Sequence, residues 1–189
     1  MSSACKVEDL PGAAQERLGL AGLREHAYLE GDFVLRSGRR SRYYLDKYRF
    51  ETQPDLLGPL GMRIAEAVAE HEPEAARLAG PELGAVPLAA AASLASGLPY
   101  LIVRKEAKDY GTANRLEGVF EPGEVVCLVE DVVTSGGAAI SAVQAIRGAG
   151  LVCRTAICVV DREEGGVDEL ARHAVRLRPL FTAADVLSA

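Results

Sequence analysis

The chain has 189 residues, of which 49% are hydrophobic and 25% charged, a composition typical of one soluble globular domain. Its net charge of −6 argues against a broad nucleic-acid-binding surface, so nucleic acid is not an expected partner. The N-terminus lacks an apolar core of signal-peptide length and no apolar run approaches a membrane span. We therefore expect a cytoplasmic protein that makes no membrane contact.

The first half of the chain predicts helices around a short pair of strands. A basic turn, 36–41, separates the two strands, and the later helix repeats leucine, isoleucine and valine at helical spacing. The predicted elements are a helix over 11–29, strands over 31–35 and 43–45, and helices over 54–70 and 86–96.

The second half alternates between strands and helices more regularly, which predicts an α/β fold with a mostly parallel sheet. Ligands bind such sheets at the carboxyl ends of the strands, where residues 104–118, 130–138 and 161–166 would share one crevice. The predicted elements are strands over 100–103, 125–129, 152–160 and 175–177, a polar loop over 105–118, helices over 137–149 and 167–173, and a terminal helix capped by Thr182 and Asp185.

The four cysteines are predicted to be reduced core residues. None forms a CxxC pair. Cys127, Cys153 and Cys158 stand in or beside apolar, strand-like segments, where a free thiol packs as a small hydrophobic group. A structural role for these side chains is therefore favoured over a metal-binding or catalytic one.

The strand expected at 125–129 leads into a stretch typical of an anion-binding site. Glu130 and Asp131 follow the strand directly, and two hydroxyl residues and two glycines then open the next helix. Small residues let backbone N–H groups approach an anion, and the helix N-terminus adds partial positive charge. The two carboxylates can accept hydrogen bonds from vicinal hydroxyls, so the pattern suits a ribose 5-phosphate. A tight strand–helix turn with an acidic cap is the structural alternative.

This stretch, Val125–Ala138, resembles the PRPP-binding signature of type I phosphoribosyltransferases. Further segments resemble orotate phosphoribosyltransferases in particular, and the matches run in order from about residue 30 to 166. They are Phe33–Arg39 with Tyr43 and Tyr44, Gly80–Ala89, Arg104–Gly111 with Leu116–Gly118, and Asp161–Gly165.

The resemblance implies a type I phosphoribosyltransferase fold, with a mostly parallel sheet flanked by helices. It implies a single domain over residues 1–189, with a core at about 51–165 and a small hood formed mainly by about 1–50 and the C-terminal segment. It also implies a homodimer with shared active sites. Mg²⁺ is the implied cofactor, held mainly through PRPP and not directly by the protein.

The resemblance also assigns roles to individual residues. PRPP would be bound by Arg36, Arg104, Lys105, Lys108, Tyr110, Glu130, Asp131, Val132, Val133, Thr134, Ser135, Gly136, Gly137 and Ala138. Within this set, the carboxylates hold the ribose hydroxyls and Thr134–Ala138 wrap the 5-phosphate. The implied catalytic residues are Arg104, Lys105, Lys108 and Asp131. Orotate would be bound by Tyr43, Tyr44, Thr134 and Arg162, with the guanidinium facing the carboxylate of the base.

The implied reaction forms orotidine 5′-monophosphate and pyrophosphate from orotate and PRPP, in de novo pyrimidine biosynthesis. Displacing pyrophosphate from C1 of ribose develops positive charge on the sugar and negative charge on the leaving group. The enzyme needs orientation, cations aimed at pyrophosphate and a lid that excludes water, and it needs no covalent nucleophile. The polar segment 105–118 is long enough to form such a lid.

Several positions depart from the family pattern. Arg36 replaces a common lysine and keeps its charge, whereas Tyr110 replaces a loop histidine and cannot carry its proton at neutral pH. Gly84 stands where some members have a lysine, which removes one possible pyrophosphate contact. Asn114 and Arg115 differ from a Gly-rich loop.

Two other functions remain open at this point. The protein could transfer the phosphoribosyl group to a different base, although Arg162 favours a carboxylated one. It could also be a regulator that senses PRPP without turnover, although the retained loop cations favour an enzyme. Structural alternatives exist as well: a solvated charged loop at 104–108, packing roles for Tyr43 and Tyr44, and an ion pair of Arg162 with Asp161 or Glu163.

Overall fold

The computed structural model describes residues 12–34, 38, 40–106 and 115–188, with side chains described from Leu20 onward. Arg36, Lys108, Tyr110 and Asn114 lie outside the described residues, as does Cys5. The helices are α1 (Gly12–Ala27), α2 (Lys47–Glu51), α3 (Pro54–His71), α4 (Ala85–Ser96), α5 (Gly137–Gly148), α6 (Gly166–Arg172) and α7 (Ala183–Ser188). The strands are β1 (Tyr28–Val34), β2 (Arg40–Leu45), β3 (Arg77–Pro81), β4 (Tyr100–Val103), β5 (Leu116–Glu117), β6 (Val125–Val133), β7 (Val152–Asp161) and β8 (Arg176–Thr182).

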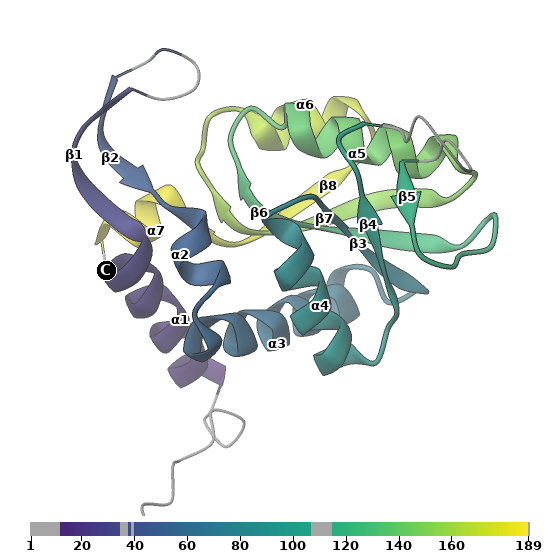
Figure 1. The fold of residues 1–189 in the computed structure, drawn as a ribbon, viewed down its shortest axis with the longest axis horizontal. Helices are drawn as coiled ribbons and strands as arrows, with labels where there is room; N and C mark the ends of the chain where they lie inside the picture. Colours follow the sequence, from purple (N-terminus) through teal and green to yellow (C-terminus); the bar gives the residue numbers. More distant parts are fainter. Residues whose placement is uncertain (1–11, 35–37, 39, 107–114, 189) are drawn as a thin grey trace, which may run out of the picture.

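Six strands form one sheet in the order β5-β4-β3-β6-β7-β8, and all neighbours except β4 and β5 are parallel. Helices α3 and α4 cover one face of this sheet and α5 and α6 cover the other (Figure 1). The alternation of side chains along β6 supplies both cores: Cys127 and Val129 pack with α3 and α4, whereas Val126 and Leu128 pack with α5. The predicted α/β fold with a mostly parallel sheet is confirmed.

A second sheet pairs β1 and β2 as an antiparallel hairpin. It lies with α1, α2 and α7 on one side of the molecule, at the left of Figure 1. Leu23 of α1, Phe50 of α2 and Val186 of α7 are buried in the same core cluster as α3, so this side is packed onto the main sheet. The hairpin side and the main sheet therefore form one continuous body (Figure 1).

Several predicted boundaries were wrong. The strand expected at 125–129 continues to Val133, because its last residues still pair with β7. The last strand runs over Arg176–Thr182 rather than 175–177, since Pro179 does not interrupt its pairing with β7. The first helix ends at Ala27, and β1 starts immediately afterwards. Three short elements, α2, β3 and β5, were not predicted.

The cysteine prediction is confirmed for the described residues. Cys127, Cys153 and Cys158 are free and buried. Burial raises the pKa of all three thiols, and that of Cys153 rises to about 11. These side chains are therefore protonated and unreactive at neutral pH.

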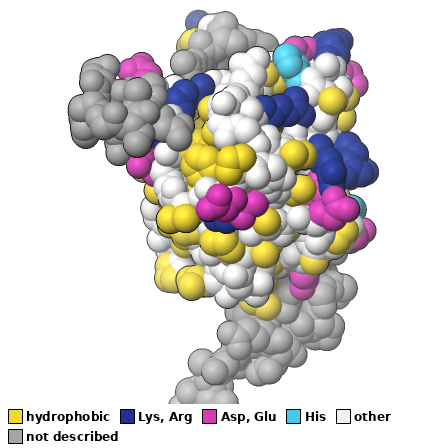
Figure 2. Space-filling model, turned by 90° about the vertical axis from the view of Figure 1, so that its right-hand side faces the viewer, with side chains coloured by type: hydrophobic (Ala, Val, Ile, Leu, Met, Phe, Trp, Pro, Cys, Tyr) yellow, Lys and Arg dark blue, Asp and Glu magenta, His cyan; other side chains and the backbone are white. Residues whose placement is uncertain are grey.

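The surface drawn in Figure 2 carries Lys and Arg side chains in separate small groups, with acidic and hydrophobic side chains between them. This arrangement agrees with the acidic composition of the chain. Within the described part of the chain, no helix is long and apolar enough to cross a membrane.

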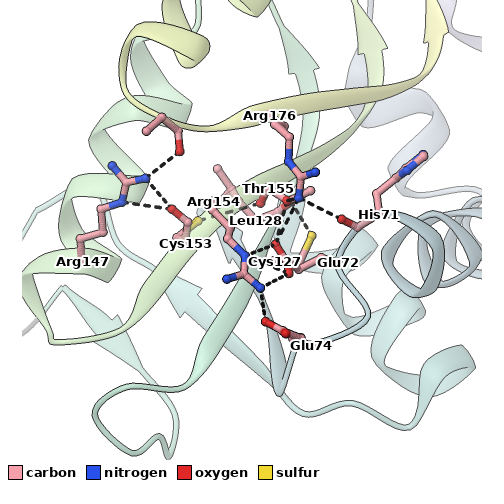
Figure 3. A network of polar contacts seen from close by, with 11 residues as sticks. His71, Glu72, Glu74, Cys127, Leu128, Arg147, Cys153, Arg154, Thr155 and Arg176 are labelled. Atoms are coloured by element: carbon pink, nitrogen blue, oxygen red, sulfur yellow. Dashed lines mark hydrogen bonds and ion pairs between the residues drawn. The ribbon is translucent and has the colours of Figure 1, made fainter.

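A network of polar contacts closes the amino edge of the sheet (Figure 3). Glu72, which directly follows α3, is only 2% exposed. It accepts hydrogen bonds from Arg154 at 2.9 Å and from the Thr155 hydroxyl at 2.8 Å, and Arg176 Nη2 lies 4.0 Å away. The network thus links the end of α3 to the first residues of β7 and β8.

Candidate active site

The segment between β6 and α5 forms an anion cradle. Gly136 has a φ of 84°, a left-handed conformation that favours glycine, and it is the N-cap of α5. No side chain caps this helix, so its first N–H groups remain available to a ligand. The cradle borders an open pocket of about 350 Å³ lined by Glu130, Val132, Val133, Thr134, Ser135, Gly136, Gly137, Ala138 and Ala139. The structure therefore brings the predicted phosphate-binding residues together.

Glycines also allow the cradle to pack against the start of α6. A Cβ at Gly166 would lie 2.5 Å from Val133 Cγ1 and 2.6 Å from the Thr134 carbonyl oxygen. A Cβ at Gly136 would lie 3.4 Å from the Gly166 carbonyl oxygen. The start of α6 therefore packs directly against the turn at Thr134–Gly136.

The two acidic residues at the end of β6 have different surroundings, as expected for neighbours on a strand. Glu130 borders the cradle pocket, and its Oε1 is buried without a hydrogen-bond partner among the described residues. Burial, together with the nearby charge of Asp131, raises the pKa of Glu130 to about 8. Asp131 instead accepts hydrogen bonds from Lys47 Nζ at 2.6 Å and from the Val132 backbone N–H at 2.5 Å.

The first two predicted loop cations lie just beyond β4. Arg104 Nη1 is 3.5 Å from Glu117 Oε1, so this guanidinium is held at the base of the loop. The backbone N–H of Lys105 donates to Glu82 Oε1 at 2.7 Å, which joins the ends of β4 and β3. The peptide bond between Glu82 and Leu83 is cis. The third predicted cation, Lys108, lies outside the described residues.

Arg115, which departs from the family pattern, makes hydrogen bonds to Arg104 and Ser141. Its Nε donates to the Arg104 carbonyl at 2.9 Å, and the Arg104 N–H donates to the Arg115 carbonyl at 2.8 Å. Its two terminal nitrogens donate to the carbonyl oxygen and hydroxyl of Ser141 at 3.3 and 3.1 Å. Arg115 therefore links Arg104, at the end of β4, to Ser141 of α5.

Arg162, at the end of β7, faces the hairpin. Its side chain is 8% exposed, and its guanidinium carbon lies 5.0 Å from the centre of the Tyr43 ring. The carboxylate in ion-pair range is that of Glu164, at 3.4 Å, instead of Asp161 or Glu163. The Nε atom of Arg162 is buried without a hydrogen bond to the described residues.

The two predicted orotate-binding tyrosines lie on opposite faces of β2. Tyr43 stacks on Tyr28 with ring centres 5.8 Å apart and carries Arg162 on its ring. Tyr44 contacts Phe33 at 5.6 Å and is 40% exposed. Because their side chains diverge, only the Tyr43 ring lies against Arg162.

Two polar residues of α2 also reach this site, and the sequence pattern did not indicate them. Lys47 contacts Asp131, and Glu51 is only 2% exposed beside it. Burial, followed by the charge of Asp131, raises the pKa of Glu51 to about 8. Burial alone would lower the pKa of Lys47, but its hydrogen bond to Asp131 and the nearby charges of Asp131 and Glu51 together outweigh burial and raise it. One hint of these residues was present in the sequence: Gly84 stands where some family members have a lysine, so a cation is missing from the loop after β3.

Comparison with known proteins agrees with this site. No family model matches the chain. An orotate phosphoribosyltransferase of Halobacterium salinarum is 51% identical over 159 residues, which make up 84% of this chain and 89% of that protein. The crystal structure of the Aeropyrum pernix orotate phosphoribosyltransferase is 34% identical, covers 87% of this chain and 92% of its own, and gives a TM-score of 0.77.

The orotate phosphoribosyltransferase of Mycobacterium tuberculosis in complex with PRPP is 28% identical and has a TM-score of 0.77. The match covers 91% of this chain and 98% of that one. The sheet order and the cradle at its carboxyl edge define the fold of a type I phosphoribosyltransferase. Within that class, the chain belongs to the orotate phosphoribosyltransferase family.

Proposed function

We propose that this protein transfers the 5-phosphoribosyl group of PRPP to orotate, giving orotidine 5′-monophosphate and pyrophosphate in pyrimidine biosynthesis. The observation that carries the proposal is the placement of a phosphate cradle and a nearly buried, incompletely bonded Arg162 at the same edge of one sheet. The names of the relatives and the PRPP held by the Mycobacterium protein support both substrates.

In this reaction the bond between C1 of ribose and pyrophosphate breaks, and the electron pair leaves with pyrophosphate. A ring nitrogen of orotate supplies the pair for the new bond to C1, and the proton of that nitrogen passes to solvent. The chain contributes orientation: the cradle would hold the 5-phosphate, and Glu130 Oε1 would accept from a ribose hydroxyl. Such a hydrogen bond favours the ionised carboxylate and would lower the raised pKa of Glu130 when PRPP binds.

We propose Mg²⁺ as the cofactor, held mainly through PRPP. Among the described residues, no group of three or more His, Cys, Asp or Glu side chains could hold a metal ion alone. The carboxylates of Glu130 and Asp131 suit a hard cation that is shared with the oxygen atoms of a substrate. When bound, the ion would offset negative charge on the pyrophosphate.

We also propose a cytoplasmic homodimer whose active sites are shared between subunits. This proposal rests on the resemblance of the loop segment Arg104–Gly118 to loops that close over a neighbouring subunit. The hydrogen bonds between Arg104 and Arg115 support it indirectly, because these two residues, which flank the loop, are held together beside the crevice.

The proposed reaction is tested by mixing the protein with orotate, PRPP and Mg²⁺ and following the loss of orotate absorbance, with a control that omits PRPP. We expect turnover, and we expect Lys108→Ala to reduce kcat by about 100-fold, because a cation aimed at the leaving group is lost. Arg172→Ala, at an exposed position of α6, serves as the charge-matched control and should be unchanged. PRPP binding without orotate turnover would overturn the assignment and direct the search to other bases or to a regulatory role.

Arg162→Gln is expected to raise the KM for orotate by about 10- to 100-fold, because a forked contact to the carboxylate of the base is lost. The KM for PRPP should change much less. Arg178→Gln, at an exposed position of β8, is the matched control. Equal orotate KM values for Arg162→Gln and Arg178→Gln would remove Arg162 from the base-binding site.

A further inference from the structure

Side chains from α2 and β6 converge beneath Gly84, the residue before α4. A Cβ at Gly84 would lie 2.0 Å from Asp131 Oδ2, 2.7 Å from Glu51 Oε1 and 3.0 Å from Lys47 Nζ. These three polar groups thus fill the space that a side chain at position 84 would need. Lys47 and Asp131, which are in direct contact, are 84 residues apart in sequence.

Lys47 has N–H donors left over for a ligand. An ammonium group carries three N–H donors, and one of them is used by Asp131 at 2.6 Å. The Lys47 side chain is 34% exposed, so the ammonium reaches the open side of the crevice, near the ring of Tyr48 at 5.4 Å. Glu51 lies on the inner side, and its Oε1 is buried without a hydrogen-bond partner among the described residues.

We propose that Lys47 is an additional PRPP-contacting residue of this site, and that Glu51 positions its ammonium between Asp131 and Gly84. The inference rests on the proposed function, because it takes PRPP as the ligand of the cradle. Lys47 already contacts a carboxylate assigned to the ribose hydroxyls, and it lies against the loop that follows β3. A ribose bound there would bring its pyrophosphate within reach of the remaining N–H donors.

The physical reason is charge compensation. PRPP is a polyanion, and the crevice contains the buried carboxyl groups of Glu51, Glu130 and Asp131. An ammonium at this point offsets the repulsion between the Asp131 carboxylate and the incoming phosphates. Gly84 permits the arrangement, because any side chain there would displace Lys47 or Asp131. The cation missing from the loop after β3 is thus supplied by α2.

The inference is tested by titrating PRPP with Mg²⁺ into the protein without orotate and measuring the heat of binding. Lys47→Met should raise the Kd for PRPP by about 10-fold or more, because a charge-assisted hydrogen bond is lost. Lys47→Arg, which keeps the charge, should fall between Lys47→Met and the unmodified protein. Arg49→Met is the matched control, since Arg49 is on the same helix and its side chain is 53% exposed; it should bind PRPP normally.

The role of Glu51 is tested in the same assay by a double-mutant cycle. Glu51→Gln should weaken PRPP binding in the unmodified protein and have no further effect when Lys47→Met is present. Independent, additive effects of the two changes would overturn the positioning role. A thermal unfolding midpoint measured for each variant separates loss of binding from loss of the fold, and Lys47→Arg keeps the test valid if Lys47→Met does not fold.

The outcomes also separate this inference from the proposed function. If the unmodified protein does not bind PRPP, the proposed function fails. If it binds PRPP and converts orotate, but Lys47→Met binds PRPP with the same Kd, only the assignment of Lys47 is overturned.

Discussion

Replacing Asp131 by asparagine is expected to lower kcat/KM for PRPP by about 100- to 1,000-fold. Asparagine keeps the shape of the side chain but removes the negative charge and one acceptor oxygen. The ribose would lose an anionic partner at the stage when positive charge develops on the sugar. The Lys47 ammonium, now 2.6 Å from Asp131 Oδ2, would also lose its partner and its fixed position.

The measurement is the initial rate of orotate loss over a range of PRPP concentrations. Asp168→Asn, at an exposed position of α6, is the matched control and should behave like the unmodified protein. A rate for Asp131→Asn within about twofold of the unmodified protein would be far below the expected loss and would rule out a catalytic role for this carboxylate.

The second large effect concerns stability. Glu72→Ala is expected to lower the free energy of unfolding by about 2–3 kcal/mol, because it leaves the Thr155 hydroxyl and a guanidinium without their buried acceptor. The value is placed below that for a fully buried pair, since Arg154 is 43% exposed and can remain hydrated. Urea unfolding measures the change. The contacts are those drawn in Figure 3.

Glu74→Ala provides the control, because Glu74 also contacts Arg154 but is 68% exposed. Its effect should stay below about 0.5 kcal/mol, as is usual for an exposed pair. Equal effects for the two variants would show that burial of Glu72 contributes nothing to the free energy of unfolding.

The effect of Glu72→Ala should also depend on pH. Burial raises the pKa of Glu72, but hydrogen bonds from Arg154 and Thr155 and the charges of Arg154 and Arg176 together outweigh burial and lower it below the ordinary value of 4.5. The folded protein therefore holds fewer protons than the unfolded chain near this pH, and the stabilisation is lost as pH falls through the folded-state pKa. The difference between Glu72→Ala and the unmodified protein should be constant above about pH 5.5 and shrink on acidification.

Much of the core could be predicted from local patterns. The helix α3 has apolar residues at helical spacing, and β4 and α5 were placed to within a residue because their turn signals lie beside apolar segments. The end of β6 could not be predicted, since Glu130 and Asp131 resemble the start of a loop. Pairing of Glu130 with Cys158 and of Val133 with Asp161 keeps these residues in the sheet. Tertiary contacts therefore decided that boundary, and local propensity did not.

The site was partly predictable for the same reason. Residues close together in sequence, such as Thr134–Ala138, form the cradle through local backbone geometry, and this was visible as a motif. Lys47 and Glu51 were missed, because α2 has only five residues and shows no period. Their contact with Asp131 exists only once the hairpin side packs on the main sheet. The spacing of residues in the sequence therefore could not predict this contact.

Strand β7 carries the contacts of Glu72 at one end and leads at the other end into Arg162, the residue that we propose binds the base. Thr155 belongs to the network around Glu72, whereas Arg162 follows the last residue of the strand. Seven residues of extended chain separate these two positions by roughly 20 Å. Substitutions at one end can therefore change how firmly the protein folds while leaving the geometry of the other end intact. Variation that adapts this enzyme to heat or acidity has room to accumulate at the amino edge, without compromising what happens at the carboxyl edge.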